Sequence, residues 1–169
     1  MVLVGLPGVG KSTVGAEAAR RLRRPFVDLD EQIERLAGQR VHEIFATRGE
    51  AFFRSLETAA THELLSQPSS IVAPGGGWIE RPENTAIVAG RALVVYLKAS
   101  PAVALRRAEQ DETIRPLLVG SNPEARIAAL FERRSALYDA ADHTIDTEVL
   151  TTEEVVKALM ELILRPGAL

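Results

Sequence analysis

Hydrophobic residues along this chain fall into short apolar runs, which alternate with longer stretches in which apolar positions recur at helical spacing. A short apolar run is typical of a strand buried on both faces, and helices between such runs predict a parallel sheet. We expect five strands, over residues 2–5, 25–29, 70–73, 93–97 and 144–146. The pattern thus predicts an α/β fold of three layers, with a central five-stranded parallel sheet flanked by helices.

Local signals mark where the helices between these strands begin and end. Prolines that suit a first helical turn stand at Pro82, Pro101 and Pro123. Thr152 precedes two glutamates, as an N-cap residue would, and Gly38 and Gly49 are expected to end helices. Helices are therefore expected over residues 12–24, 31–37, 41–48, 50–67, 82–89, 101–110, 123–138 and 152–164.

Composition narrows the class of protein. The 169 residues are 46% hydrophobic and contain no repeat or linker, which predicts one domain. A net charge of −3 with scattered arginines argues against a nucleic-acid surface. The chain has no cysteine and no apolar run near the roughly 18 residues of a membrane span. We therefore expect a cytoplasmic monomer that binds neither nucleic acid nor a membrane.

Residues 5–12 read Gly-Leu-Pro-Gly-Val-Gly-Lys-Ser, a complete phosphate-binding loop between an expected strand and an expected helix. Its glycines let backbone N–H groups face the β-phosphate of a nucleotide, and the following helix adds its positive end. Lys11 can reach the β- and γ-phosphate oxygens, and the Ser12 hydroxyl can ligate Mg²⁺. The motif predicts binding of a nucleoside triphosphate with Mg²⁺ by Gly8, Val9, Gly10, Lys11, Ser12 and Thr13.

Two segments interrupt the alternation of strands and helices. A helical excursion over residues 31–57 separates the second and third strands, and a polar, turn-rich stretch over 111–122 separates two helices. In an enzyme that transfers a phosphoryl group, the excursion is suited to binding the acceptor and the loop to closing over the site. We expect 31–57 to be an acceptor-binding subdomain and 111–122 to be a lid.

Asp28 and Asp30 stand at the end of the second expected strand. Alternation along an extended chain places both carboxylates on one side, at the edge of the sheet where ligands bind. Taken alone, the pair is also open to interpretation as solvated loop residues or as a helix cap, although we favour the ligand site.

Further candidate site residues follow along the chain. They are a charged pair at helical spacing (Arg54 and Glu57), a triple glycine (Gly75, Gly76 and Gly77) and two arginines (Arg115 and Arg134). Arg115 stands in Thr-Ile-Arg-Pro-Leu-Leu and Arg134 in Arg-Ser-Ala-Leu-Tyr. From the first strand to about Asp146, these elements resemble the shikimate kinase family, within the nucleoside-monophosphate-kinase-like group of P-loop folds.

The resemblance implies that the chain phosphorylates the 3-hydroxyl of shikimate with ATP and Mg²⁺. It implies that Ser12 and Asp28 hold the metal, while Asp30 contacts the acceptor hydroxyls and can accept a proton. Lys11 and Arg115 would spread the charge of the phosphates. Lys11, Asp30 and Arg115 are thus the implied catalytic residues, and Arg115 also belongs to the nucleotide site.

The same resemblance implies an acceptor site made of Asp30, Arg54, Glu57, Gly75, Gly76, Gly77 and Arg134. Guanidinium groups suit the carboxylate of shikimate, and glycines let the ring approach the main chain. By itself, the Arg54–Glu57 pair is also open to interpretation as a surface ion pair. Of the neighbours Arg133 and Arg134, the register with Leu-Tyr favours Arg134.

For the adenine, the resemblance favours Arg107 over Arg106, opposite the loop 147–151. Three residues depart from the family pattern, at Pro74, Trp78 and Ala136. Trp78 directly follows the triple glycine, where an indole could reshape the acceptor pocket. We expect it to pack against apolar neighbours instead, as most tryptophans do.

Two other functions fit parts of the pattern. A kinase for another small acid or sugar acid, such as gluconate, would use the same phosphate loop but would need the arginines and the triple glycine less. A nucleotide-sensing module without catalysis would have no use for Lys11, Ser12, Asp28, Asp30 and Arg115 together.

Overall fold

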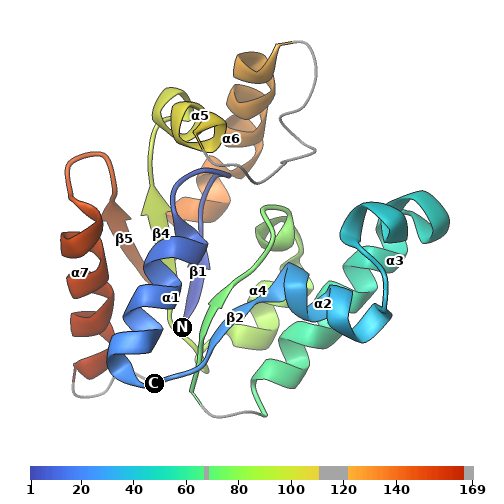
Figure 1. The fold of residues 1–169 in the computed structure, drawn as a ribbon, viewed down its shortest axis with the longest axis horizontal. Helices are drawn as coiled ribbons and strands as arrows, with labels where there is room; N and C mark the ends of the chain where they lie inside the picture. The colour runs from blue at the N-terminus through green and yellow to red at the C-terminus, as the bar shows by residue number, and fades with distance from the viewer. Residues whose placement is uncertain (67–68, 111–121, 166–169) are drawn as a thin grey trace.

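The structure is a computed structural model that describes residues 1–66, 69–110 and 122–165. At its centre lies a parallel sheet of five strands in the order β2-β3-β1-β4-β5 (Figure 1). The strands are β1 (Val2–Val4), β2 (Phe26–Asp28), β3 (Ile71–Ala73), β4 (Val94–Lys98) and β5 (His143–Asp146). The predicted five-stranded parallel sheet is confirmed.

Register brings the carboxyl ends of the strands to one edge of the sheet. Val2 of β1 lies beside Val72 of β3 on one side and beside Val94 of β4 on the other. The chain fills one side of β1 with β2 and β3 and then the other side with β4 and β5. The connections therefore diverge at the end of β1, which is where open parallel sheets bind ligands.

Helices cover both faces of the sheet, and all residues of β1 and β3 are accordingly buried. In Figure 1, α1 and α7 lie side by side, while α2 and α3 pack together as a lobe beyond β2. The helices of the described residues are α1 (Lys11–Leu22), α2 (Leu29–Ala37), α3 (Val41–Leu64), α4 (Pro82–Val88), α5 (Pro101–Glu109), α6 (Pro123–Asp139) and α7 (Thr152–Leu164), with a 3₁₀ turn η1 (Trp78–Glu80).

Most predicted helix ends hold, and one detail was wrong. Gly38 ends α2 in the left-handed region, at φ 66°. Gly49 breaks helical geometry at φ 81° and ψ 169°, so α3 consists of two helical segments that meet at a kink where the sequence predicted a helix end. The cap of α7 is Thr151 rather than Thr152, because Thr151 and Glu154 form a reciprocal capping box with bonds of 3.3 Å and 2.8 Å.

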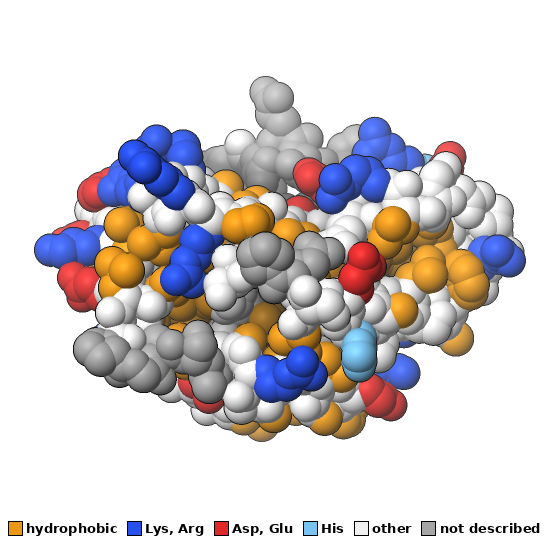
Figure 2. All heavy atoms as spheres, turned by 90° about the horizontal axis from the view of Figure 1, so that it is seen from below, with side chains coloured by type: hydrophobic (Ala, Val, Ile, Leu, Met, Phe, Trp, Pro, Cys, Tyr) orange, Lys and Arg blue, Asp and Glu red, His pale blue; other side chains and the backbone are white. Residues whose placement is uncertain are grey.

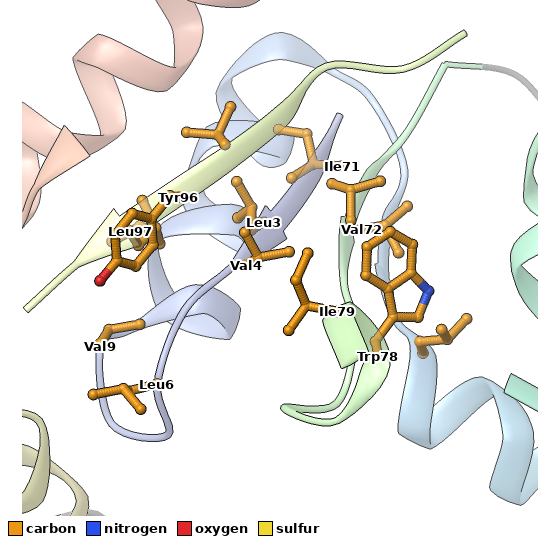
Figure 3. Packing of buried hydrophobic residues seen from close by; sticks show 14 of the residues in the cluster. Leu3, Val4, Leu6, Val9, Ile71, Val72, Trp78, Ile79, Tyr96 and Leu97 are labelled. Carbon is orange, nitrogen blue, oxygen red and sulfur yellow. The ribbon is translucent and has the colours of Figure 1, made fainter. Parts of the chain in front are cut away.

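Trp78 belongs to the core, as predicted. Its side chain lies beside Val72, while Ile79 points toward Leu3 and Val4 (Figure 3). Trp78 is 1% exposed, and its indole Nε1 donates a hydrogen bond of 2.8 Å to Thr61 Oγ1 of α3. The hydrogen bond satisfies the polar atom of the indole, which is the condition for burying it without a desolvation cost.

Two surface features bear on possible partners. The face seen from below in Figure 2 carries basic side chains in separate groups among acidic and apolar ones. Among the described residues, no helix has the length and apolar character needed to cross a membrane.

Candidate active site

The predicted phosphate loop joins β1 to α1 at the switch point of the sheet. Gly8 and Gly10 take positive φ values of 88° and 92°, which side chains disfavour, and Gly10 directly precedes the first turn of α1. Lys11 Nζ lies over the loop, donating to the carbonyls of Gly5 at 2.9 Å and Leu6 at 3.1 Å. The first turn of α1, with its free backbone N–H groups, thus directly follows a curled loop, which is the arrangement that binds phosphate.

Ser12 and Asp28 meet next to this loop. The Ser12 hydroxyl donates a hydrogen bond of 3.1 Å to Asp28 Oδ2, although the residues are 16 positions apart. A hydroxyl and a carboxylate are the oxygen ligands that Mg²⁺ takes from proteins while keeping several waters. Among the described residues, no group of three or more His, Cys, Asp or Glu side chains could hold a metal. The pair fits a magnesium ion shared with phosphate oxygens.

The sequence-based placement of Asp30 on an extended strand was wrong. Helix α2 already begins at Leu29, so Asp30 lies in its first turn. The reason is the carboxylate of Asp28, which caps the helix by accepting the N–H groups of Asp30 at 3.1 Å and Glu31 at 3.4 Å. Asp28 is therefore both a cap, as the alternative interpretation held, and a neighbour of Ser12.

Asp30 is an unusual carboxylate. Its Oδ1 is buried and has no hydrogen-bond partner among the described residues. Burial and the nearby charge of Asp28 raise its pKa to about 6, against the opposing charges of Arg54 and Lys11. An acid in this range can accept a proton near neutral pH, which suits a general base.

The triple glycine receives three side chains from different helices. A Cβ at Gly75 would lie 2.7 Å from Asp30 Oδ1, and a Cβ at Gly76 would lie 3.0 Å from an Arg134 guanidinium nitrogen. At Gly77 a Cβ would collide with the guanidinium of Arg54. The absence of a Cβ at these positions thus lets the ends of the three side chains lie against the main chain, and a Cβ would displace them. We call Asp30, Arg54, Glu57 and Arg134, with Gly75–Gly77, the acceptor cluster.

Arg54 and Glu57 form an ion pair of 3.0 Å, but it is not the surface pair of the alternative interpretation. Glu57 is fully buried, and its Oε1 has no hydrogen-bond partner among the described residues. Burial raises the pKa of Glu57 to about 7, although Arg54 opposes the shift. Arg54 also contacts the exposed Glu50 at 3.1 Å. The pair therefore anchors Arg54 beside Gly75–Gly77, which we call the acceptor loop.

Arg134 is the buried member of its pair, as the register predicted. Its side chain is 3% exposed, whereas that of Arg133 is 63% exposed. The Nε of Arg134 donates to the carboxylate of Glu80, and one terminal nitrogen, NH1, is buried without a partner among the described residues. That nitrogen is the one facing Gly76, so it is directed at the acceptor loop.

Arg107 lies beside Thr147, in the loop that the resemblance places opposite it. Its guanidinium donates to Thr147 Oγ1 at 2.9 Å and to the Thr147 carbonyl at 2.7 Å, which joins α5 to the loop after β5. Arg106 is exposed instead. Arg115 and the predicted lid lie outside the described residues, except for Asn122, which caps α6 by accepting the N–H of Ala125 at 3.1 Å.

Comparison with known proteins adds to this geometry. A family model described as shikimate kinase matches residues 7–164. The chain belongs to the shikimate kinase family. A shikimate kinase of Burkholderia pseudomallei (strain 1710b) is 42% identical over 164 residues, which cover 97% of this chain and 87% of the relative.

Solved structures agree with this membership of the shikimate kinase family. A shikimate kinase from Acinetobacter baumannii, solved in complex with shikimate, superposes with a TM-score of 0.87 at 38% identity, covering 96% of this chain and 91% of that one. A gluconokinase from Sinorhizobium meliloti 1021 reaches a TM-score of 0.62 at 19% identity, with 94% and 87% of the two chains covered, and so shares the fold. The co-substrate of the shikimate kinase family is ATP.

Glu80 is the residue at this shikimate kinase site that sequence reasoning missed. It follows the triple glycine by three positions and contacts both Arg133 and Arg134 of α6. Its position directly after the apolar Trp78-Ile79 gave no indication by itself that the carboxylate would be partly buried. Which cation it meets is a matter of tertiary structure.

Proposed function

We propose that this protein transfers the γ-phosphoryl group of ATP to the 3-hydroxyl of shikimate, giving shikimate 3-phosphate and ADP. The observation that carries the proposal is the convergence of Asp30, Arg54 and Arg134 on the triple glycine, beside the phosphate loop. Shikimate bears one carboxylate and three hydroxyls, so it needs guanidinium groups and hydrogen-bond acceptors in one small site. Family membership supports the same substrate.

In the proposed reaction, Asp30 orients the attacking hydroxyl and takes its proton as the new oxygen–phosphorus bond forms and the bond to the ADP oxygen breaks. The raised pKa of Asp30, near 6, suits this transfer. Phosphoryl transfer otherwise depends on positioning and on neutralising charge. Lys11 supplies positive charge at the phosphates, and Arg54 with Arg134 binds the acceptor carboxylate.

Three parts of the proposal rest on motif matches and local chemistry. Ser12 and Asp28 would hold Mg²⁺, which when bound neutralises charge on the phosphates. Arg107 would lie against the adenine, and Arg115 would contact the phosphates from the segment 111–122, for which a lid remains our prediction. We also propose that the helices of the excursion 31–57 form an acceptor-binding subdomain, since Asp30, Arg54 and Glu57 all come from it or its boundary.

We further propose that the enzyme is a cytoplasmic monomer with no nucleic-acid partner. The support is indirect, namely the net charge of −3 and the absence of cysteine from the chain. Light scattering of the purified protein at micromolar concentration would measure its mass. A dimer mass of about twice 18.3 kDa would contradict the monomer.

The test of function is ADP release measured with shikimate, with gluconate and with no acceptor, together with identification of the product. We expect release that depends on shikimate and yields shikimate 3-phosphate. Turnover on gluconate with none on shikimate would make the protein a sugar-acid kinase instead. ATP binding without turnover on either acceptor would favour a nucleotide-sensing module.

A further inference from the structure

The turn that carries Glu80 is firmly held. Trp78 and Ile79 of η1 are 1% and 5% exposed, and Figure 3 shows both side chains among the strands of the core. The N–H groups of Trp78 and Glu80 donate to the carbonyls of Gly75 and Gly77, each at 3.1 Å. The backbone of Glu80 is thus fixed with respect to the acceptor loop.

The carboxylate of Glu80 meets two arginines of α6, which packs against η1. It accepts from Nε of the buried Arg134 and, at 3.1 Å, from the exposed Arg133. The side chain of Glu80 is itself 33% exposed. Burial would raise its pKa, but the hydrogen bond and charge of Arg134, with those of Arg133, hold that pKa below its usual range. Glu80 is therefore ionised at neutral pH.

The two ends of the Arg134 guanidinium lie in different surroundings. Its Nε is bound by Glu80, whereas NH1 is buried without a partner among the described residues and faces Gly76. A guanidinium is planar, so fixing its Nε edge also fixes the direction of its remaining N–H groups. The unused donors are those a planar carboxylate could take.

We propose that Glu80 is a positioning residue for the acceptor, holding Arg134 so that NH1 is directed over Gly76 at the acceptor carboxylate. The inference rests on the proposed function, in which Arg134 binds that carboxylate. Glu80 does not touch the reacting atoms, so its effect belongs to acceptor binding. The test below separates this role from two others. The carboxylate of Glu80 would compete with the acceptor carboxylate for Arg134 in the first, and would only stabilise the fold in the second.

The test compares Glu80→Ala, Glu80→Gln and Glu132→Ala in the full chain. Glu132 is an exposed acid of α6, the helix that carries Arg134. Its replacement changes the net charge as much as replacing Glu80 does, without removing a partner of Arg134. For each variant, KM for shikimate, KM for ATP, kcat and the melting temperature are measured, and shikimate binding is measured by calorimetry. Wild-type turnover on shikimate tests the proposed function, and only the variant series tests Glu80.

We expect Glu80→Ala to raise KM and Kd for shikimate about tenfold while KM for ATP changes less than twofold. Glu80→Gln keeps an oxygen acceptor for Nε, so its KM and Kd for shikimate should rise about threefold or less. This variant also preserves the test if the alanine variant does not fold. Glu132→Ala should match wild type. Arg133→Ala should stay within about twofold, since the effect runs through Arg134.

A double variant separates positioning from general stability. If Glu80 acts through Arg134, then Glu80→Ala should add nothing to the shikimate KM of Arg134→Ala. A lower KM for shikimate in Glu80→Ala would make Glu80 a competitor and overturn the proposal. Equal increases in both KM values, or a full additional loss in the double variant, would reduce Glu80 to a structural role.

Discussion

The phosphate loop takes its ligand-facing groups from consecutive residues between β1 and α1, whereas the acceptor cluster takes Asp30, Arg54 and Arg134 from α2, α3 and α6. The loop works chiefly through backbone N–H groups and one helix end. The cluster works through charged side chains, each held by an acid or by burial: Arg54 by Glu57 and Arg134 by Glu80. The phosphate loop is therefore built from one local segment, whereas the acceptor cluster is assembled from segments far apart in the chain.

The largest effect on activity should come from a substitution in the phosphate loop. Lys11→Ala should lower kcat at least a hundredfold, because charge neutralisation at the γ-phosphate is worth several kcal/mol of barrier, about 3 or more. The free energy of unfolding should fall by about 1–3 kcal/mol, since Lys11 Nζ donates hydrogen bonds to two loop carbonyls, but the variant should still fold. Steady-state kinetics and a thermal melt measure both. Unchanged kcat in a folded variant would remove Lys11 from the mechanism.

Loss of either acceptor arginine should spare the nucleotide. Arg54→Ala and Arg134→Ala should each weaken shikimate binding by about 2–4 kcal/mol, roughly 30-fold to several hundredfold, because a carboxylate loses a charged partner. ATP affinity should stay near wild type. Calorimetry with each substrate checks the split, and the exposed Arg133→Ala is the control. If the variants lose ATP and keep shikimate, the two subsites are reversed.

A pH profile sharpens the comparison further. Asp30 must be ionised to accept a proton, and its raised pKa lies near 6. As pH falls below about 6, kcat/KM for shikimate should therefore drop about tenfold per unit, while ATP binding changes less. Because Glu57 titrates near pH 7 and is coupled to Asp30, the acid limb belongs to the pair. The folded variant Asp30→Asn should have low activity, and any acid limb that remains should come from Glu57 alone and lie at a different pH. An identical limb in that variant would remove Asp30 as the base.

The smallest effect on activity should come from substituting Trp78, which packs in the core next to the acceptor loop. Trp78→Phe removes the donor to Thr61 Oγ1 and leaves some indole space unfilled, so we expect a loss of about 1–2 kcal/mol in the free energy of unfolding. KM for shikimate should rise only a few-fold, since Trp78 points into the core (Figure 3). Chemical denaturation and steady-state kinetics measure the two. A tighter acceptor site in this variant would show that the indole does restrict it.

Some features of this protein were determined by its sequence alone. The phosphate loop, the five strands, and the proline and glycine signals at helix ends depend on neighbours within a few residues, so their patterns could be read directly. The family resemblance favoured Arg134 over Arg133, and in the structure the side chain of Arg134 is buried while that of Arg133 is exposed.

Only the tertiary structure decided the rest. It buried Oδ1 of Asp30 next to Gly75, buried Glu57 beside Arg54, and brought Glu80 to an arginine 54 positions away. These outcomes depend on desolvation and on charges from distant segments, which act through space and leave no periodic trace in the chain. Sequence fixes which groups are available, and packing determines which of them share the low-dielectric interior where their charges interact strongly.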